Sequence, residues 1–597
     1  MKDTDPVKDI GAANVPDSRG VNMYRADPAL AALMTVYLPG PLRPVMEEQL
    51  HRMGALVGDR LEDLALTADK NPPTLSLRDR TGAACQRIVK HPAYEELERV
   101  AFAEFGLAAM SHRGGVFGQP DKLHPIAKYA LVYLFVQAEF GLCCPLSMTD
   151  SLTRTLCKFG SNALIDRYLD RLTSQDMDRL FQGAMFITEQ AAGSDVGAVE
   201  TVARNVDGTW RLYGDKWFCS NPDAALAMVL ARPEHGAAGT RGLSLFLLPR
   251  HLPDGRLNAY RIIRLKDKMG TRSMASGEIT LEGAEAYLVG EAGQGFKQMT
   301  DMINMSRLAN GVRSAGLMRR AVSEALFIAR HRSAFGKRLI DMPLMRRQLA
   351  KMLLPGEQAR SMVFHTAQVL DAADRGNADM AKVLRILTPL IKFRACRDAR
   401  KVCADAMEVR GGCGYIEEWS DARVLRDAHL GSIWEGTSNI VALDVSRAVR
   451  RAGALDALSD YLLSCLDEVD AAQAQPIAQA LDRAGSLMRA AAGRDQPATD
   501  AETRRAATAL YNVTSAVFLA WESAQLATTS PAVATDRARL ASMVLSERLS
   551  AHDPLAPAED EPDWLCDLLM RAGIDPDAAM DADDQGDATQ HEVGVHA

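Results

Sequence analysis

The sequence predicts a mostly α-helical protein with a central β-sheet domain. Three observations lead to this fold class. Apolar residues recur at three- and four-residue steps before position 183, alternate in short runs from 183 to 291, and return to helical spacing after Gly293–Gly295. A hydrophobic content of 47% over 597 residues is ample for several buried cores, which excludes a wholly disordered chain.

The part before the β domain divides into an arm and a helical domain. Residues 1–20 are polar and contain Pro6, Pro16 and two glycines, so they are predicted to form a flexible arm. Residues 21–182 have helical periodicity, and Ile126–Cys143 is nearly all apolar, as expected of a helix buried on most sides. We therefore predict an N-terminal helical domain over 21–182.

The rest of the chain changes from strand to helix patterns. Short apolar runs separated by turns, such as Pro253–Gly255, predict a small antiparallel β domain over 183–291. Helical spacing predicts a bundle domain over 292–450 and an extra C-terminal helical domain over 451–575. The last residues, 576–597, are acidic and are predicted to be a solvated tail.

The charge balance and the missing motifs exclude several classes of function. With 69 basic and 77 acidic residues, the chain has a net charge of -8 and no global attraction to nucleic acid, although a local patch is still compatible with it. Apolar runs fall short of the roughly 20 residues of a bilayer span. No secretory signal is visible, so we predict a cytoplasmic protein. Phosphate-binding loops, dinucleotide fingerprints, nucleophile elbows and zinc spacings are absent, and no metal site is predicted.

Two segments of the β domain combine small or aromatic residues with hydroxyls. In 185–197, the bare backbone at Gly193 and Ser194 permits close approach of a flat ring or a thioester. In 214–221, aromatic residues beside a hydroxyl suit stacking on a planar cofactor. An ordinary strand exit and a packed hairpin explain the two segments equally well.

Two further segments lie in the predicted bundle. Arg332 suits a pyrophosphate, because a guanidinium forks onto phosphate oxygens, although a solvated basic turn is an alternative. The Gly411–Gly414 turn lets backbone amides approach an anion. Glu435 lies between Ile433-Trp434 and a Gly-Thr-Ser turn, where partial burial would suit general-base work and where helix capping is the alternative.

Taken together and in this order, the motifs resemble those of the acyl-CoA dehydrogenase superfamily. They are ITEQAAGSD, GDKWFCSN, RLKDKMGTRSMAS, HRSAFGKRLI, GGCGY and RDAHLGSIWEGTSNI. The segment CPLSMT at 144–149 and the extra helices after 450 resemble its AidB-like branch. The resemblance implies a helical domain, a β-barrel-like domain and a four-helix domain around FAD, in a homotetramer built as a dimer of dimers.

The resemblance also implies individual cofactor contacts. Those expected around the flavin are Met185, Ile187, Thr188, Ser194, Phe218 and Ser220. Arg332 and Phe335 match residues that contact the FAD of a neighbouring subunit. At the ADP side, the matching residues are Glu408, Gly411 and Gly412, and Thr437 and Asn439 match the cofactor's own-subunit end.

The resemblance assigns catalysis to Glu435. Some family members carry the base at the position of Ser306, which cannot serve, so Glu435 is the one base available. Ser194 and Arg307 are expected to contact the acyl-CoA substrate. Glu435 is expected to remove the α proton while a hydride leaves the β carbon for flavin N5, giving a trans-2-enoyl-CoA. An electron-transfer flavoprotein is the expected acceptor.

Two rival functions stay open from the sequence. The AidB-like branch includes a DNA-binding protein with feeble dehydrogenase activity, and tetramer assembly could gather Arg504, Arg505, Arg537 and Arg539 into a basic groove. However, residues 451–550 hold nine basic and twelve acidic side chains, so DNA is not the favoured partner. An oxygen-reacting oxidase or monooxygenase is the other possibility, and the presence of Glu435 favours dehydrogenation or oxidation over monooxygenation.

Overall fold

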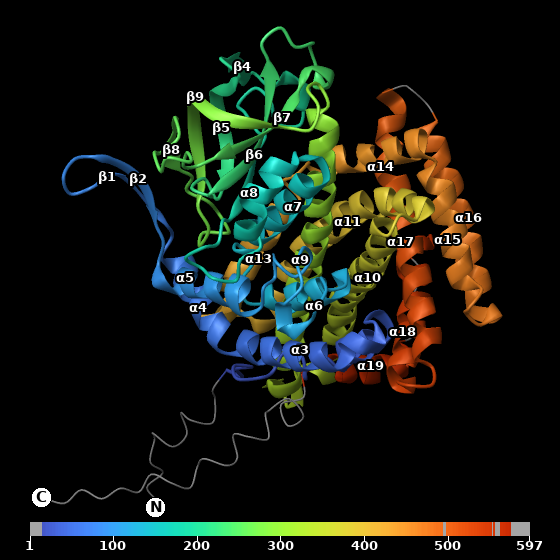
Figure 1. Cartoon of the computed structure of the whole chain (residues 1–597). Helices are drawn as coiled ribbons and strands as arrows, with labels where there is room; N and C mark the ends of the chain where they lie inside the picture. The colour runs from blue at the N-terminus through green and yellow to red at the C-terminus, as the bar shows by residue number, and fades with distance from the viewer. Residues whose placement is uncertain (1–14, 494–496, 552, 554, 556–560, 575–597) are drawn as a thin grey trace, which may run out of the picture.

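In the computed structural model, the sheet domain, which is central in the sequence, lies at one end of a larger helical body, as Figure 1 shows. The structure describes residues 15–493, 497–551, 553, 555 and 561–574. The predicted fold class is confirmed. The N-terminal helices are α2 (Pro28–Tyr37), α3 (Arg43–Gly58), α4 (Arg60–Lys70), α5 (Pro92–Glu98), α6 (Pro125–Phe135), α7 (Cys143–Phe159) and α8 (Asn162–Leu172).

A β-hairpin interrupts this helical region, which the sequence analysis did not predict. It consists of β1 (Thr74–Arg78) and β2 (Ala84–Val89), paired antiparallel, and it extends away from the body in Figure 1. Its base leans on the sheet domain, where Ile262 N–H donates to Gln86 Oε1 at 2.8 Å. Alternation over five or six residues was too short to stand out among helical patterns.

Seven strands form the central sheet domain. They are β3 (Gly183–Phe186), β4 (Val202–Val206), β5 (Thr209–Ser220), β6 (Leu226–Pro233), β7 (Ser244–Pro249), β8 (Tyr260–Leu265) and β9 (Ser276–Val289). The order is β3-β6-β4-β5-β9-β7, with β8 beside β9. The β3–β6 and β4–β6 pairs are parallel, so the prediction of a purely antiparallel domain is wrong for them. These parallel pairs join strands that are far apart in sequence, and local alternation does not specify their direction.

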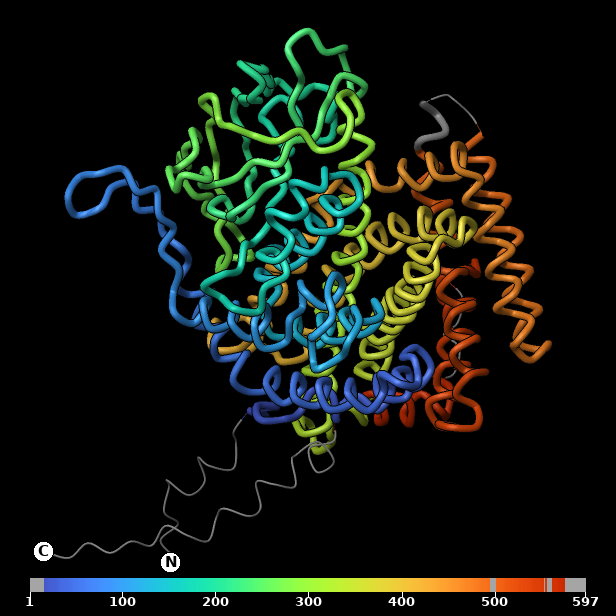
Figure 2. Tube along the Cα trace, in the orientation of Figure 1, coloured from blue at the N-terminus to red at the C-terminus, as the bar shows by residue number. Residues whose placement is uncertain are grey.

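Three long helices build the bundle beneath the sheet. They are α9 (Gly295–His331), α10 (Pro343–Asp374) and α11 (Ala378–Arg410), followed by α12 (Gly412–Tyr415), α13 (Ser420–Gly431) and α14 (Ser438–Ala452). Figure 2 shows α9 running from the sheet domain through the body. α9 and α11 approach closely at Gly311, where an added Cβ would lie 2.1 Å from Ile391 Cγ2. This close approach places the functional residues of α9 and α11 near one another.

The C-terminal helices pack against the outer side of the bundle. They are α15 (Ala454–Leu466), α16 (Ala471–Ala492), α17 (Pro497–Leu526), α18 (Pro531–Val544) and α19 (Trp564–Ala572). Tyr37 on α2 donates to Glu522 on α17 at 2.7 Å, and Arg537 on α18 pairs with Glu357 on α10 at 2.6 Å. Buried polar contacts therefore join the extra helices to both the N-terminal domain and the bundle.

The ends of the predicted domain scheme are only partly described. In the predicted flexible arm, Ser18 is buried and its hydroxyl donates to Glu324 at 2.7 Å, so this part of the arm is held on the body. The predicted acidic tail, 576–597, lies outside the described residues. Within the described part of the chain, no helix combines the length and apolar character needed to cross a bilayer. Nor do three metal-ligating side chains gather anywhere in the described part.

Candidate active site

Glu435 lies in the loop between α13 and α14, in a left-handed backbone conformation with φ of 55°. Such a φ is uncommon for a residue with a side chain and is maintained by surrounding contacts. Asn310 Nδ2 donates to Glu435 Oε2 at 3.0 Å, and Arg307 Nε donates to the Glu435 carbonyl at 3.4 Å. Lys392 Nζ donates to the carbonyl of Gly436. Three bundle side chains thus hold the backbone and the carboxylate of Glu435.

Arg307 is committed to protein partners. Its Nη1 pairs with Asp444 at 2.6 Å, and Asp444 also pairs with Arg385 at 2.8 Å. Arg307 is buried, and its carbonyl contact described above links this ion pair to the Glu435 loop. These contacts give Arg307 a positioning role, and its predicted contact with the substrate stays a prediction.

The predicted flavin residues of the sheet domain gather where β3 and β5 end. Trp217 N–H donates to the Thr188 carbonyl at 2.8 Å, which joins the loop after β3 to β5. Beneath this junction, the buried Lys216 pairs with Glu189 at 2.5 Å and donates to the Leu230 carbonyl at 3.0 Å. Burial alone would raise the pKa of Glu189, but the Lys216 charge brings the pKa below its ordinary value. The ion pair therefore fixes the loop that carries Thr188.

The side chains of this group differ in exposure. Met185, Ile187, Thr188 and Ser220 are half-buried, Ser194 is exposed, and Phe218 is 58% exposed. Lys266 Nζ lies 4.8 Å from the Phe218 ring centroid. A phenyl ring this exposed at a strand end is available to stack on a planar group.

Cys144, near the start of α7, links the sheet half of the site to the bundle half. Burial raises the pKa of its thiol to about 11. The neighbours that further modulate this pKa are Arg313, Glu435, Lys268 and Ser220. Groups from the sheet domain and from the bundle thus both influence this thiol on α7.

Arg332, Phe335, Glu408, Gly411 and Gly412 form a second cluster at the far end of α11. Arg332 Nη1 donates to the Arg410 carbonyl at 3.1 Å, directly before Gly411. Phe335 is 97% exposed and lies between the two short strands β10 (Ser333–Ala334) and β11 (Lys337–Arg338).

Within this chain, the second cluster lies far from Glu435. Lys392 and Glu408 are sixteen positions apart on α11, which corresponds to about 24 Å along the helix axis. The site therefore consists of two parts within a single chain.

Thr437 and Asn439 lie at the start of α14, two and four residues after Glu435. Both are exposed, and Thr437 is the N-cap residue. Arg504 on α17 donates to Asn439 Oδ1 at 3.0 Å. The extra C-terminal domain thus contacts the predicted own-subunit end of the cofactor site.

The four arginines considered for a basic groove in a tetramer have different surroundings within this chain. Arg537 is buried and paired with Glu357 and Glu522, so it is unavailable to DNA. Arg505 pairs with Glu502 at 2.9 Å, and Arg539 lies 5.2 Å from the Trp564 ring. These arginines have separate protein partners because carboxylates and aromatic rings distant in sequence meet them in the fold.

Several residues of the site were missed from sequence. Asn310 and Arg313 on α9 and Lys392 on α11 are buried polar residues. The detectable signal was the spacing of Ser306, Asn310 and Arg313, which places all three on one helix face. The ring centroid of Trp434, next to Glu435, lies 4.8 Å from the guanidinium carbon of Arg313.

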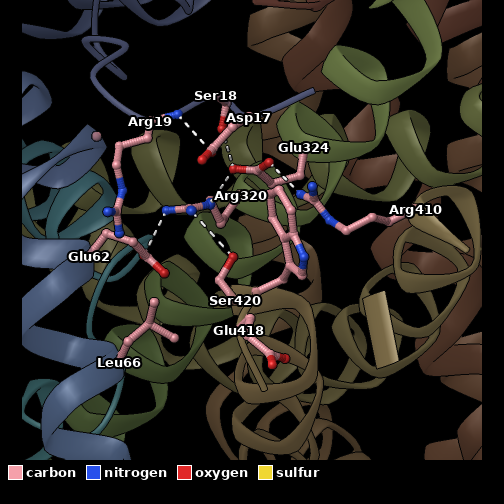
Figure 3. A pocket seen from close by; sticks show the side chains of 12 residues that line it. Asp17, Ser18, Arg19, Glu62, Leu66, Arg320, Glu324, Arg410, Glu418 and Ser420 are labelled. Carbon is pink, nitrogen blue, oxygen red and sulfur yellow. Dashed lines mark hydrogen bonds and ion pairs between the residues drawn. The ribbon is translucent and has the colours of Figure 1, made fainter. Parts of the chain in front are cut away.

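A polar pocket of about 230 Å³ lies apart from the residues around Glu435 (Figure 3). Arg320 pairs with Glu62 and Glu324 at 3.0 Å, and Arg410 pairs with Glu324 at 2.7 Å. Ser18 donates to the same glutamate. The charged residues that line this pocket form ion pairs with one another. These contacts hold the N-terminal segment on the bundle.

Comparison with known proteins identifies the class that this fold and site define. Sequence models of the middle and C-terminal domains of acyl-CoA dehydrogenase match residues 184–284 and 293–450. The N-terminal domain of the adaptive response protein AidB matches residues 13–179. The chain belongs to the acyl-CoA dehydrogenase family and has an AidB-type N-terminal domain.

Two relatives and one solved structure show the extent of the similarity. The AidB protein of Escherichia coli strain K12 is 36% identical over 74% of this chain and 80% of its own length. Acyl-CoA dehydrogenase family member 11 of Caenorhabditis elegans is 33% identical over 71% of this chain and 70% of its own. A crystal structure of C. elegans ACDH-11 in complex with C11-CoA superposes with a TM-score of 0.83 at 28% identity, covering 90% of this chain and 93% of that one.

Proposed function

We propose that the protein is an FAD-dependent acyl-CoA dehydrogenase that converts an acyl-CoA thioester to a trans-2-enoyl-CoA. The observation that carries the proposal is the Glu435 carboxylate, which accepts a hydrogen bond from Asn310 Nδ2 at 3.0 Å in the loop before α14. A positioned carboxylate beside a cofactor site is what removal of a weakly acidic α proton requires. The acyl-CoA complex of the C. elegans relative supports this class of substrate.

The residues of the chain fit FAD in shape and chemistry. A Cβ added at Gly193 or Gly412 would meet no atom within 4 Å, which leaves room for a ligand against the backbone. The exposed rings of Phe218 and Phe335 offer stacking surfaces at the two parts of the site. FAD, when bound, supplies the hydride acceptor. We propose that its ring is held by Met185, Ile187, Thr188, Ser194, Phe218 and Ser220.

The distance between the two parts of the site favours an assembly. We propose that Arg332, Phe335, Glu408, Gly411 and Gly412 contact the FAD of a neighbouring copy, while Thr437 and Asn439 contact the cofactor of their own chain. A dimer of dimers would bring both sets to each cofactor. A homotetramer, an electron-transfer flavoprotein as acceptor and a cytoplasmic location belong to the same proposal.

The direct test is an anaerobic panel of acyl-CoA thioesters that follows bleaching of the flavin absorbance band. We expect the purified protein to contain FAD and to bleach with at least one member of the panel. Glu435→Gln should keep FAD and should bleach about 10²- to 10⁴-fold more slowly, because the proton acceptor is removed. Bleaching at the wild-type rate would exclude Glu435 as the base.

A further inference from the structure

Four buried polar atoms around Glu435 have no hydrogen-bond partner among the residues that the structure describes. They are Ser306 Oγ, Asn310 Oδ1, Arg313 Nη1 and Trp434 Nε1. The first three belong to positions i, i+4 and i+7 of α9, which lie on one face of a helix, and Trp434 directly precedes Glu435. Buried polar atoms in folded proteins normally have partners, so such a group at one place indicates where ligand atoms belong.

Arg313 is the charged member of this group. It is 1% exposed, its Nε donates to the Ala309 carbonyl at 3.2 Å, and its Nη2 donates to Ser147 Oγ at 3.5 Å. Its guanidinium carbon lies 4.8 Å from the Trp434 ring centroid and 5.7 Å from that of Phe140. Across the described residues, no carboxylate forms an ion pair with it. A buried guanidinium of this kind lacks its counter-charge.

The position of Arg313 relates it to the acyl chain rather than to the thioester. Asn310 contacts the carboxylate of Glu435 itself, and Arg313 follows three residues later, about 4.5 Å further along α9. If the α carbon of a substrate lies at Glu435 and its acyl chain follows this face of α9, the end of a short chain reaches Arg313 and Trp434. These two side chains present donors only, Nη1 and Nε1.

An alkyl terminus would leave both donors unpaired, whereas a terminal carboxylate accepts from both and neutralises the guanidinium. We propose that the preferred substrate is the CoA thioester of a short dicarboxylic acid, whose free carboxylate binds Arg313 and Trp434. This inference rests on the proposed dehydrogenase function and names its substrate class. Arg313 is thereby a specificity-determining residue, and the α proton still goes to Glu435.

The test compares matched thioesters on the FAD-loaded protein under anaerobic conditions. The pairs are succinyl- and butyryl-CoA, glutaryl- and pentanoyl-CoA, and adipyl- and hexanoyl-CoA, with undecanoyl-CoA as a long-chain probe. We expect the second-order rate constant of flavin bleaching to favour the dicarboxylic member of at least one pair by about 100-fold or more, as for sites built to bind a polar substrate group.

Two variants assign this preference to the proposed residues. Arg313→Leu should reduce the preference to less than about 10-fold, mainly by slowing the dicarboxylic thioester. Trp434→Phe keeps the ring, removes one donor and should lower the preference by a smaller factor. Arg483→Leu makes the same change at an exposed position of α16 and should leave both rate constants unchanged. Trp434→Phe decides the question if Arg313→Leu does not fold.

Calorimetry on Glu435→Gln separates this inference from the proposed function. This variant retains the proposed binding residues, so it should bind the dicarboxylic member of at least one pair at least about 10-fold more tightly than the monocarboxylic member. If no thioester bleaches the flavin, the dehydrogenase proposal fails and calorimetry on the three pairs alone tests the inference. Equal affinities within all three pairs, or bleaching by pentanoyl- or undecanoyl-CoA as fast as by every dicarboxylic thioester, would overturn the inference.

Discussion

Arg313 and Arg537 are buried to the same extent, each 1% exposed, but they have opposite surroundings. Arg537, between the bundle and the C-terminal helices, pairs with Glu357 at 2.6 Å and with Glu522 at 3.2 Å. Arg313, beside Glu435, stacks on Trp434 and has no ion-pair partner among the described residues. A buried charge whose partners are supplied by the fold stabilises the assembly of helices, and one without them marks a place where a ligand can supply the partner.

The largest effect on stability should follow from removing the ion pairs of Arg537. Arg537→Leu would leave Glu357 and Glu522 buried with fewer compensating charges. We expect the free energy of unfolding in urea to fall by about 3–5 kcal/mol. Arg539→Leu, on the same helix but partly exposed, is the control and should cost less than about 1 kcal/mol. A cost below 1 kcal/mol for Arg537→Leu would show that the C-terminal helices do not depend on this network.

Asp427 is a buried acidic residue whose charge is only partly compensated, in contrast to both Arg537 and Arg313. Burial raises its pKa from 3.8 to about 7, while Arg423 lowers it and Glu139 raises it further. Its Oδ1 accepts from Thr271 N–H at 2.6 Å, in the loop before β9. Between about pH 4 and pH 7 the folded protein retains a proton that the unfolded chain releases, so the contribution of Asp427 to stability is present at low pH and is lost as the pH rises through 7.

Asp427→Asn should remove this dependence. The variant stays neutral, so its free energy of unfolding relative to wild type should rise by about 2–4 kcal/mol between pH 4 and pH 8. Urea unfolding at a series of pH values measures the difference. A constant difference across this range would mean that the carboxyl group of Asp427 titrates at its ordinary pKa.

The smallest effect on the free energy of unfolding is expected for Arg313, which has no ion-pair partner among the described residues. Without substrate, Arg313→Leu removes an uncompensated buried charge and two hydrogen bonds of 3.2 and 3.5 Å. We expect the free energy of unfolding to change by less than about 1 kcal/mol, in contrast to Arg537→Leu. The same urea titrations measure it. A loss as large as that of Arg537→Leu would show that Arg313 stabilises the fold and would remove the distinction between the two regions.

The fold was largely predictable because its elements are long and periodic. α9, α10 and α11 each carry many turns of helical spacing, and the strands between 183 and 291 are separated by clear turns. The β1–β2 hairpin and the parallel pairing of β6 were not predictable by this route. Short strands carry little local signal, and strand direction depends on contacts between distant segments.

The sequence allowed candidate site residues to be proposed only where they belong to a motif. Glu435 stands in a recognisable string, whereas Asn310 and Lys392 acquire their roles through contacts with the Glu435 loop from other helices. Arg537 was considered for a basic groove in a tetramer, but Glu357 lies 180 residues earlier in the chain and pairs with it in the interior. Pairings of this kind depend on helix packing, which periodicity alone does not specify.

The central claim is that the Glu435 carboxylate removes the α proton as the thioester is oxidised. Its most direct test is a single-turnover measurement of flavin bleaching with an acyl-CoA deuterated at C2, compared with the unlabelled thioester, in wild type and in Glu435→Asp. Wild type should bleach several-fold more slowly with the deuterated substrate, and Glu435→Asp, with its shorter side chain, should be slower with both and should keep an isotope effect. Rapid bleaching of equal rate with both substrates in both proteins would contradict the account.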